Sequence, residues 1–236
     1  MRREPLIARI PRIEARCGPW DWRWASENRQ RIDAHWRERT EAKPKMFNGR
    51  VLLAHDLTIR EGTCRAAYFE TNFADFLAWR DFGYPDPHIT NGYAMGALRG
   101  SDGAFLCGIM GADTANAGRV YFPSGTPDPD DLLPDGTVDL GGSVVRELEE
   151  ETALVPGEYE AADDWIVVHR WPAAAFFRVI SLPEPAEAAA ERIRANIARQ
   201  AEPELAGIRV IRGPDEIDPV TMPQSVQAFF KAAFER

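Results

Sequence analysis

Residues 126–142 read TPDPDDLLPDGTVDLGG and residues 143–154 read SVVRELEEETAL, and the second stretch is the clearest helix in the sequence. At about 100° per residue, Glu147, Glu150 and Glu151 lie at positions i, i+3 and i+4 and fall within one sector of the helix. The adjoining sector can be buried against a sheet, and it contains Val144, Val145, Leu148 and Thr152. The helix therefore has one acidic side and one apolar side.

The three glutamates predict a metal site. Like charges at these spacings repel one another, and a hard divalent cation with oxygen ligands relieves the repulsion. Mg²⁺ takes one or two protein carboxylates and completes its shell with waters and substrate phosphates. A solvated face of a surface helix is the alternative interpretation. The preceding Gly141-Gly142 pair favours the metal site, because glycines let the backbone approach phosphates and a helix N-terminus presents free amides to anions.

Length and composition indicate a folded globular protein. The chain has 236 residues, 44% hydrophobic and 28% charged, which is enough for a full core and leaves little room for disorder. The net charge of −9 argues against unspecific binding to nucleic acid, because clustered Lys and Arg supply that affinity. An acidic protein can still bind phosphates when metal ions bridge the two.

The cysteines and the N-terminus predict a cytoplasmic protein without membrane contacts. Cys17, Cys64 and Cys107 form no CxxC pair, and an odd number cannot make a fully paired disulfide framework, so we expect reduced thiols. The first 20 residues lack the apolar core of a signal peptide, and no apolar run reaches the roughly 18 residues that span a bilayer.

The order of predicted elements is mixed α and β. Expected strands cover residues 50–60, 64–70, 91–100, 103–111, 118–125, 164–171, 173–182 and 207–213. Expected helices cover residues 25–40, 72–83, 143–154, 184–204 and 223–236. This order predicts an α/β/α sandwich around a mixed β-sheet. We expect an N-terminal extension over residues 1–90, with a helix and a β-hairpin that pack on the core, and a catalytic domain over residues 91–236.

Residues 146–154, RELEEETAL, resemble the second half of the Nudix hydrolase signature, G-x5-E-x7-R-E-U-x-E-E-x-G-U, in which U is aliphatic. The match holds at every defined position except Ala153, where the family has Gly. The resemblance implies the Nudix fold and a Mg²⁺- or Mn²⁺-dependent pyrophosphohydrolase. Its metal-binding carboxylates would be Glu147, Glu150 and Glu151, one of which also orients or deprotonates water, and Arg146 would hold the helix through a salt bridge. These four residues are the predicted catalytic set.

The first half of the signature fits in two registers. In one, Val138 stands at the family's Glu position, with Asp139 beside it. In the other, Gly125 opens the motif, Asp131 takes the Glu position, and seven extra residues precede Arg146. We expect the metal site to survive in either register and the substrate loop to be remodelled. Where the family places Gly, an alanine in a left-handed conformation costs about 1 kcal/mol more.

Residues 45–155 also resemble the Nudix hydrolases of UDP-glucose and UDP-galactose, notably in FNGRVLLAHDLTI (47–59) and YFETNFADFLAW (68–79). This implies a small-molecule nucleoside diphosphate sugar as substrate, cleaved to a nucleoside monophosphate and a sugar 1-phosphate. The alternatives are an ADP-ribose or other nucleotide pyrophosphohydrolase and a non-catalytic Nudix-fold nucleotide-binding module. A homodimer is left open.

The sequence contains further candidates for the site. The four histidines are too dispersed for a zinc site. The resemblance also implies that a late acidic residue serves as an additional base, and the candidates are Glu202, Glu204, Asp215 and Glu216. Aromatic residues that either stack a nucleobase or belong to the core are Phe73, Trp79, Trp165 and Trp171.

Overall fold

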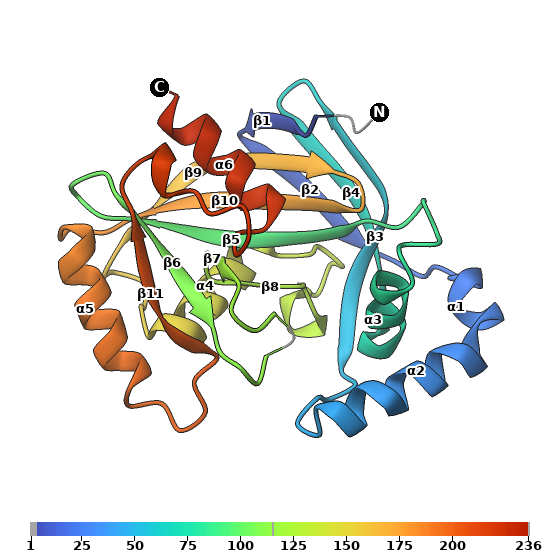
Figure 1. Cartoon of the computed structure of the whole chain (residues 1–236). Coiled ribbons are helices and arrows are strands. Elements are labelled where there is room, and N and C mark those ends of the chain that lie inside the picture. Colours follow the sequence, from blue (N-terminus) through green and yellow to red (C-terminus); the bar gives the residue numbers. More distant parts are fainter. Residues whose placement is uncertain (1–3, 115, 236) are drawn as a thin grey trace.

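The computed structural model describes residues 4–114 and 116–235 and is built on a mixed sheet flanked by helices (Figure 1). The path through this main sheet is β1-β9-β10-β5-β6-β11, with β7 beside β6 and β8 beside β5. Its strands are β1 (Leu6–Ile10), β5 (Asn91–Arg99), β6 (Phe105–Met110), β7 (Val120–Tyr121), β8 (Ser124–Gly125), β9 (Glu160–Arg170), β10 (Ala173–Ser181) and β11 (Leu205–Ile211). The central β10–β5 pair is parallel and the other pairs are antiparallel.

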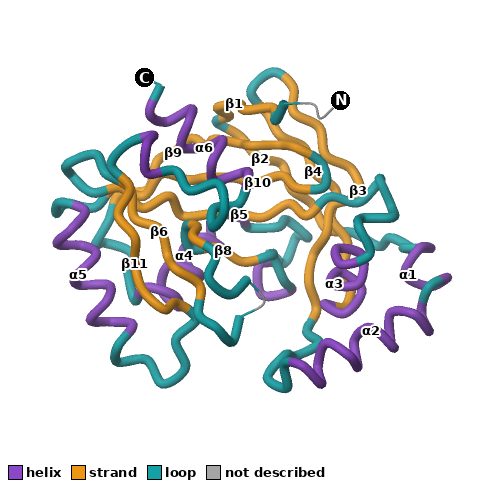
Figure 2. Tube along the Cα trace, in the orientation of Figure 1, coloured by secondary structure: helices purple, strands orange, loops and turns teal. Residues whose placement is uncertain are grey.

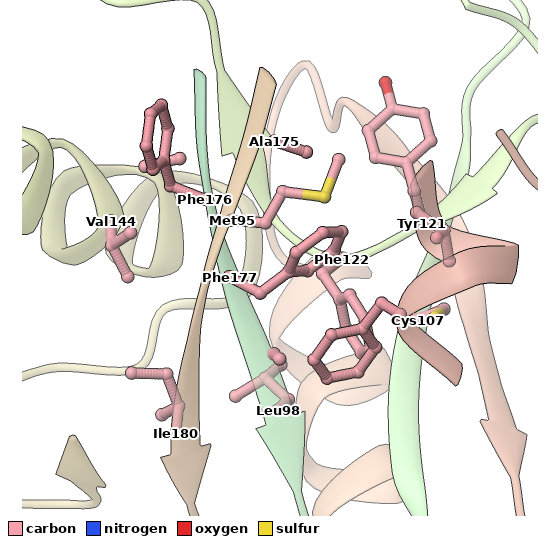
Figure 3. Close-up of a cluster of buried hydrophobic side chains, with 14 of the residues drawn as sticks. Met95, Leu98, Cys107, Tyr121, Phe122, Val144, Ala175, Phe176, Phe177 and Ile180 are labelled. Carbon is pink, nitrogen blue, oxygen red and sulfur yellow. The ribbon is translucent and has the colours of Figure 1, made fainter. Parts of the chain in front are cut away.

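Helices cover both faces of the main sheet (Figures 1 and 2). They are α4 (Leu140–Thr152), α5 (Ala186–Ile197) and α6 (Gln224–Phe234). Successive side chains of a strand point to opposite faces, so Phe176 of β10 lies on the side of Val144 while Phe177 stacks on Phe229 of α6 at 4.5 Å (Figure 3). The predicted α/β/α arrangement around a mixed sheet is confirmed.

A second, smaller sheet has the order β2-β4-β3. Its strands are β2 (Arg12–Cys17), β3 (Arg50–Arg60) and β4 (Thr63–Asn72), and the helices beside it are α1 (Arg23–Glu27), α2 (Arg29–Ala42) and α3 (Phe73–Asp81). The predicted hairpin is β3–β4, and it is confirmed. Between this sheet and its helices lies an aromatic core of Trp22, Trp79 and Phe69 with smaller apolar neighbours.

The N-terminal 20 residues contain two strands that the sequence pattern did not predict. β1 pairs with β9 in the main sheet, and directly after Pro11 the chain enters the small sheet, where β2 pairs with β4. The segment that precedes residue 90 is therefore hydrogen-bonded to the main sheet as well as packed on it. The division into units at residue 90 stays a prediction. No helix in the described ranges is both long and apolar enough to cross a membrane.

Candidate functional site

The acidic helix α4 is fixed at both ends and along one side. Asp139 caps its start by accepting a hydrogen bond from the Gly142 N–H at 2.9 Å. Its apolar side packs on β5, where a side chain at Gly96 would meet Leu148 at 3.0 Å. The helix ends at Ala153, which has φ +58° and ψ +26°. The left-handed turn for which the Nudix signature has glycine is thus made by alanine, at a cost of about 1 kcal/mol.

The loop before α4 forms a closed hairpin over residues 132–138. Its base is a hydrogen bond from the Asp139 N–H to the Asp131 carbonyl at 2.8 Å, and further in, the Leu133 N–H donates to the Thr137 carbonyl at 2.9 Å. Its outer side pairs with β2, since the Val138 N–H donates to the Ala15 carbonyl at 3.0 Å. We call residues 132–138 the box hairpin.

The box hairpin distinguishes the two registers of the signature. Because its base brings Asp131 next to Asp139, the seven residues loop out and leave the spacing G-x5-D-x7-R from Gly125 to Arg146. Asp131 is buried beside Arg146, whereas Val138 is buried among apolar residues. The geometry therefore favours the register in which Asp131 takes the family's Glu position.

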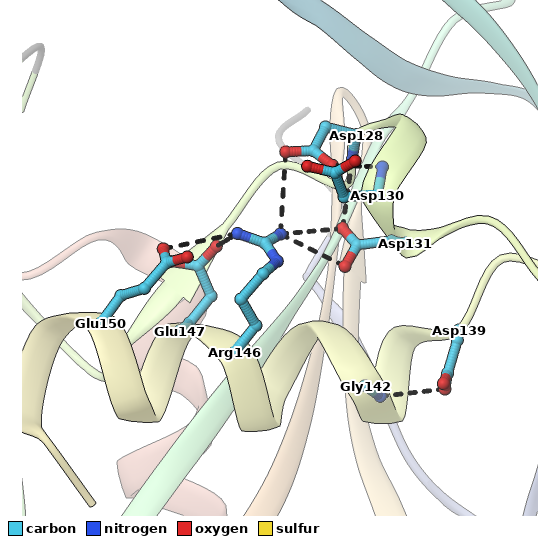
Figure 4. Close-up of polar contacts among 8 residues, drawn as sticks. All are labelled: Asp128, Asp130, Asp131, Asp139, Gly142, Arg146, Glu147 and Glu150. Carbon is cyan, nitrogen blue, oxygen red and sulfur yellow. Dashed lines mark hydrogen bonds and ion pairs between the residues drawn. The ribbon is translucent and has the colours of Figure 1, made fainter.

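Arg146 lies at the centre of a network of carboxylates (Figure 4). Its guanidinium is 3.0 Å from Asp131, 3.0 Å from Glu147 and 3.5 Å from Glu150. Burial alone would lower the pKa of Arg146, but Asp131 and Glu147 raise it overall, so this side chain stays charged. Arg146 thus connects the loop to the helix through salt bridges, and its place in the catalytic set stays a prediction.

Glu147 and Glu151 are buried carboxylates, 8% and 3% exposed. Burial raises the pKa of Glu147 to about 7, against its ordinary 4.5, although Arg146 opposes the shift. Burial also raises the pKa of Glu151 well above 4.5, and the charge of Glu147 adds to the effect. The Oε2 atom of Glu151 is buried without a hydrogen-bond partner. Two neighbouring buried acids, of which Glu151 has an unpaired acceptor atom, are stable only when protons or a bound cation neutralise their charge.

The third predicted ligand, Glu150, occupies a different position. Its side chain is 60% exposed and faces Arg146, so the structure groups Glu150 with the loop network rather than with Glu151. Within the described residues, no set of three or more His, Cys, Asp or Glu side chains is arranged to hold a metal ion unaided. Metal binding by each of the three glutamates stays a prediction.

The donor set nevertheless fits a hard divalent cation. Carboxylate oxygens are the preferred ligands of Mg²⁺ and Mn²⁺, and Mg²⁺ needs only one or two of them when substrate phosphates supply the rest. Gly125 leaves room for the Glu147 carboxylate, because a Cβ at this position would lie only 2.3 Å from the Glu147 Oε1 atom. Glu151 offers an acceptor atom without a partner. Glu147 and Glu151 are thus the two residues best suited to hold the ion.

Two further titratable groups interact electrostatically with the acid pair, and one of them was not predicted. The charge of Glu204, an exposed residue just before β11, raises the pKa of both Glu147 and Glu151, which separates it from the other late acidic candidates. Glu202 instead pairs with Lys45. Tyr121 was missed, because a tyrosine in a short strand carries no sequence signal; its pKa is raised by burial and further by Glu151.

The predicted nucleobase-stacking residues mostly belong to the core. Trp79 is fully buried and Trp165 is 8% exposed. Phe73 packs edge-on against Trp36 and Phe76. Trp171 is partly exposed, but its indole N–H donates to the Ile89 carbonyl. For Trp79 and Trp165 the core interpretation is therefore the correct one.

The solved structures that this chain resembles include Nudix hydrolases. One is the Nudix hydrolase RenU from M. smegmatis, with TM-score 0.41 and 16% identity over 61% of this chain and 84% of that one. Another is the MutT protein from Methanosarcina mazei Go1, with TM-score 0.37 and 18% identity over 61% and 92%. The Bacillus subtilis pyrophosphohydrolase BsRppH matches at TM-score 0.32 and 10% identity over 74% and 81%. No protein-family model and no curated protein matches the sequence. The chemistry of the site therefore depends on its own residues.

Proposed function

We propose that the chain is a metal-dependent pyrophosphohydrolase of the Nudix type that cleaves a phosphoanhydride bond in a small nucleoside-diphosphate derivative. The observation that carries the proposal is the buried acid pair Glu147–Glu151 on a helix that Arg146 connects to Asp131. Two buried acids side by side, of which only Glu147 contacts Arg146, are costly as a purely structural arrangement, and a cation bound between them would offset that cost. The free thiols of the three cysteines support a cytoplasmic location.

The residues of the chain divide the work of hydrolysis. When bound, Mg²⁺ or Mn²⁺ would supply positive charge that neutralises the phosphates and would lower the pKa of a coordinated water. Glu147 and Glu151 would hold the ion, with Glu150 at the exposed edge. Arg146 fixes the orientation of Glu147 through their 3.0 Å contact. Glu204, close to both buried acids and exposed, is the proposed acceptor for the proton of the attacking water.

The proposed substrate class is a nucleoside diphosphate sugar such as UDP-glucose, with ADP-ribose as the alternative. The first follows from the resemblance of residues 45–155, and the structure contributes the hairpin β3–β4 and helix α3 that these residues form. A screen of nucleoside diphosphate sugars, ADP-ribose, dinucleoside polyphosphates and CoA with Mg²⁺ or Mn²⁺, with products identified, separates them. ADP-ribose turnover without UDP-glucose turnover would reject the UDP-sugar assignment.

The test of the reaction class is Glu151→Gln, with Glu149→Gln as the matched control. Glu149 is exposed on the same helix, so its substitution should leave kcat/KM unchanged. Glu151→Gln should lower kcat/KM by roughly 10²–10⁴-fold. The fold should persist, because the buried site already favours a neutral side chain at this position. Equal activity of both variants, or a wild-type chain inert towards every compound in the screen, contradicts the proposal.

A nucleotide-binding module without turnover is the second candidate. Two observations favour it: Glu150 is exposed and faces Arg146, and the described residues contain no group of three His, Cys, Asp or Glu side chains arranged to hold a metal ion. Such a module would show thermal stabilisation by a nucleoside diphosphate and no product at high protein concentration.

A further inference from the structure

The segment from residue 43 to residue 49, between α2 and β3, lies beside the acidic site although it is far away in sequence. Lys43 donates from Nζ to the Thr114 carbonyl at 2.6 Å. Lys45 Nζ lies 3.3 Å from Glu202 and 3.9 Å from Asp113. The segment therefore contacts both the loop after β6 and the loop before β11.

These two loops border the acid pair. The loop after β6 leads directly into β7 and β8, where Gly125 lies against the Glu147 carboxylate, and its Gly111 N–H donates to the Glu204 carbonyl at 2.7 Å. Farther along the same loop, Asn116 donates to the hydroxyl of Tyr121, another neighbour of Glu151. Residues 43–47 thus form an outer rim next to the site, which we call the lysine rim.

Phe47 in the lysine rim is 82% exposed, more than any other large hydrophobic side chain in the described residues. The residues after it are anchored: Asn48 accepts from the Ala74 N–H at 2.8 Å, and the Gly49 carbonyl accepts from the Phe73 N–H at 2.8 Å. A fully buried phenylalanine gains about 1.5–3 kcal/mol, which Phe47 forgoes in the free protein. Its backbone is held in place while its ring is left uncovered.

The charge of the lysine rim suits a phosphate-bearing ligand. Lys43 and Lys45 are two of the three lysines in a chain of net charge −9. A nucleotide that approaches Glu147, Glu151 and Glu204 is repelled by these carboxylates, and cations at the edge of the site offset that repulsion. An exposed aromatic ring next to cations is the combination by which proteins hold a nucleotide without selecting its base.

We infer that the lysine rim binds the nucleoside half of the substrate and that the Phe47 ring stacks on the nucleobase. This rests on the proposed function and deepens it, because it assigns the specificity contact to the segment that precedes the hairpin β3–β4. Every nucleobase presents a π-face, so the contact favours nucleotides over base-free diphosphates without choosing among bases. Phe47 acts on binding and does not touch the reacting phosphorus.

The test compares Phe47→Ala and Phe47→Trp with the unmodified chain, and Leu6→Ala, an exposed apolar residue on the edge strand β1, serves as the control. Binding in the presence of Mg²⁺ is measured by calorimetry for α,β-methylene-ADP, α,β-methylene-UDP and the base-free methylenediphosphonate. Phe47→Ala should lower the affinity for whichever nucleotide binds the unmodified chain more tightly by roughly 5- to 150-fold. The affinity for methylenediphosphonate should stay unchanged. Phe47→Trp should restore nucleotide binding. In turnover, Phe47→Ala should raise KM and leave kcat unchanged.

The outcomes separate the inference from the function on which it rests. Turnover of a nucleoside diphosphate derivative with unchanged KM and nucleotide affinity in Phe47→Ala overturns the inference alone, and Phe47 is then an ordinary exposed apolar residue. An equal loss for methylenediphosphonate also overturns it, since the effect would not involve the base. A chain that neither binds nor hydrolyses any of these compounds overturns the proposed function together with the lysine rim.

Discussion

Gly125 is the residue whose small size matters most to the site. A Cβ there would come within 2.3 Å of the Glu147 carboxylate. Because that atom is the end of a flexible side chain, Gly125→Ala should displace Glu147 and leave the fold intact. We expect kcat/KM to fall on the order of 10²-fold, in line with the misplacement of a catalytic group, with a small change in Tm.

The control for Gly125→Ala is Gly213→Ala, where a Cβ meets nothing within 4 Å. Activity measured side by side with thermal melts separates displacement of Glu147 from loss of folding. Full activity in Gly125→Ala would show that the position of Glu147 is not needed for the reaction.

The buried acids predict an unusual pH dependence of stability. The pKa of Glu147 is about 7 in the folded chain and 4.5 in the unfolded one, so the native state keeps a proton that the unfolded state releases between these values. The free energy of unfolding of the metal-free protein should therefore fall as pH rises from about 4.5 to 7, by about 1.4 kcal/mol per unit of pKa difference.

Mg²⁺ should act in the opposite direction, because the ion replaces the proton at the deprotonated carboxylates. Melts at pH 5 and pH 8 with and without Mg²⁺ test this: stabilisation by the ion should be large at pH 8 and small at pH 5. Glu147→Gln should flatten the pH dependence. The assignment is contradicted if the free energy of unfolding of the metal-free protein rises between pH 5 and pH 7 and Glu147→Gln abolishes that rise.

At the residue scale, helical spacing in the sequence was enough to predict α4. It was not enough to predict which loop residue pairs with Arg146 of that helix. Helical periodicity predicted one acidic face made of Glu147, Glu150 and Glu151; Glu147 and Glu151 are buried, whereas Glu150 is exposed beside Arg146. Asp131 and Val138 could not be separated, because the contacts that decide between them join Asp131 to Asp139 and Val138 to Ala15. The second of these contacts spans more than a hundred residues.

At the element scale, the box hairpin is an addition that can be removed. Deletion of residues 132–138 would join Asp131 to Asp139, which are already hydrogen-bonded, and restore the uninterrupted spacing before Arg146. The lost backbone hydrogen bonds to Ala15 and Cys17 are worth about 1 kcal/mol each, and the loss of the buried Val138 side chain adds about 1.5–3 kcal/mol. We expect a lower Tm by several degrees and retained activity, measured by melts and by kcat/KM.

Arg16→Ala is the matched control for this deletion. Arg16 pairs with Asp135 of the box hairpin at 3.0 Å, and both side chains are 61% exposed, so the pair should contribute less than about 1 kcal/mol. Loss of activity on deletion with an unchanged Tm would show that the hairpin itself takes part in the reaction.

Several elements differ from the prediction for identifiable reasons. The expected helix over residues 25–40 is divided at Asn28, whose side chain donates to the Trp24 carbonyl and competes with the helical pattern. Strand β1 was missed because it lies at the sheet edge, where Leu6 and Ile7 stay exposed and the alternation of buried residues is lost. The expected strand over residues 118–125 forms as the two short strands β7 and β8.

At the scale of the whole molecule, the two sheets are joined by more than a linker. Besides the chain turn at Pro11, the Tyr68 hydroxyl donates to the Gly92 carbonyl at 3.1 Å, and the Leu52 N–H donates to the Pro127 carbonyl at 2.7 Å. The sequence predicted a mixed sheet flanked by helices because each element repeats its own pattern locally. It did not predict that the small sheet supports the loop carrying Asp131, since that depends on distant pairings.

The box hairpin also bears on how chains of this kind can be recognised. A pattern that fixes the number of residues between Gly125 and Arg146 rejects this sequence, although Asp131 and Arg146 lie together in space. The seven residues of the box hairpin are enclosed by the hydrogen bond between Asp131 and Asp139. They lengthen the motif in sequence without moving its residues apart in space. A pattern that describes this chain must allow both a hairpin at this position and the residues Asp131 and Ala153 on either side of it.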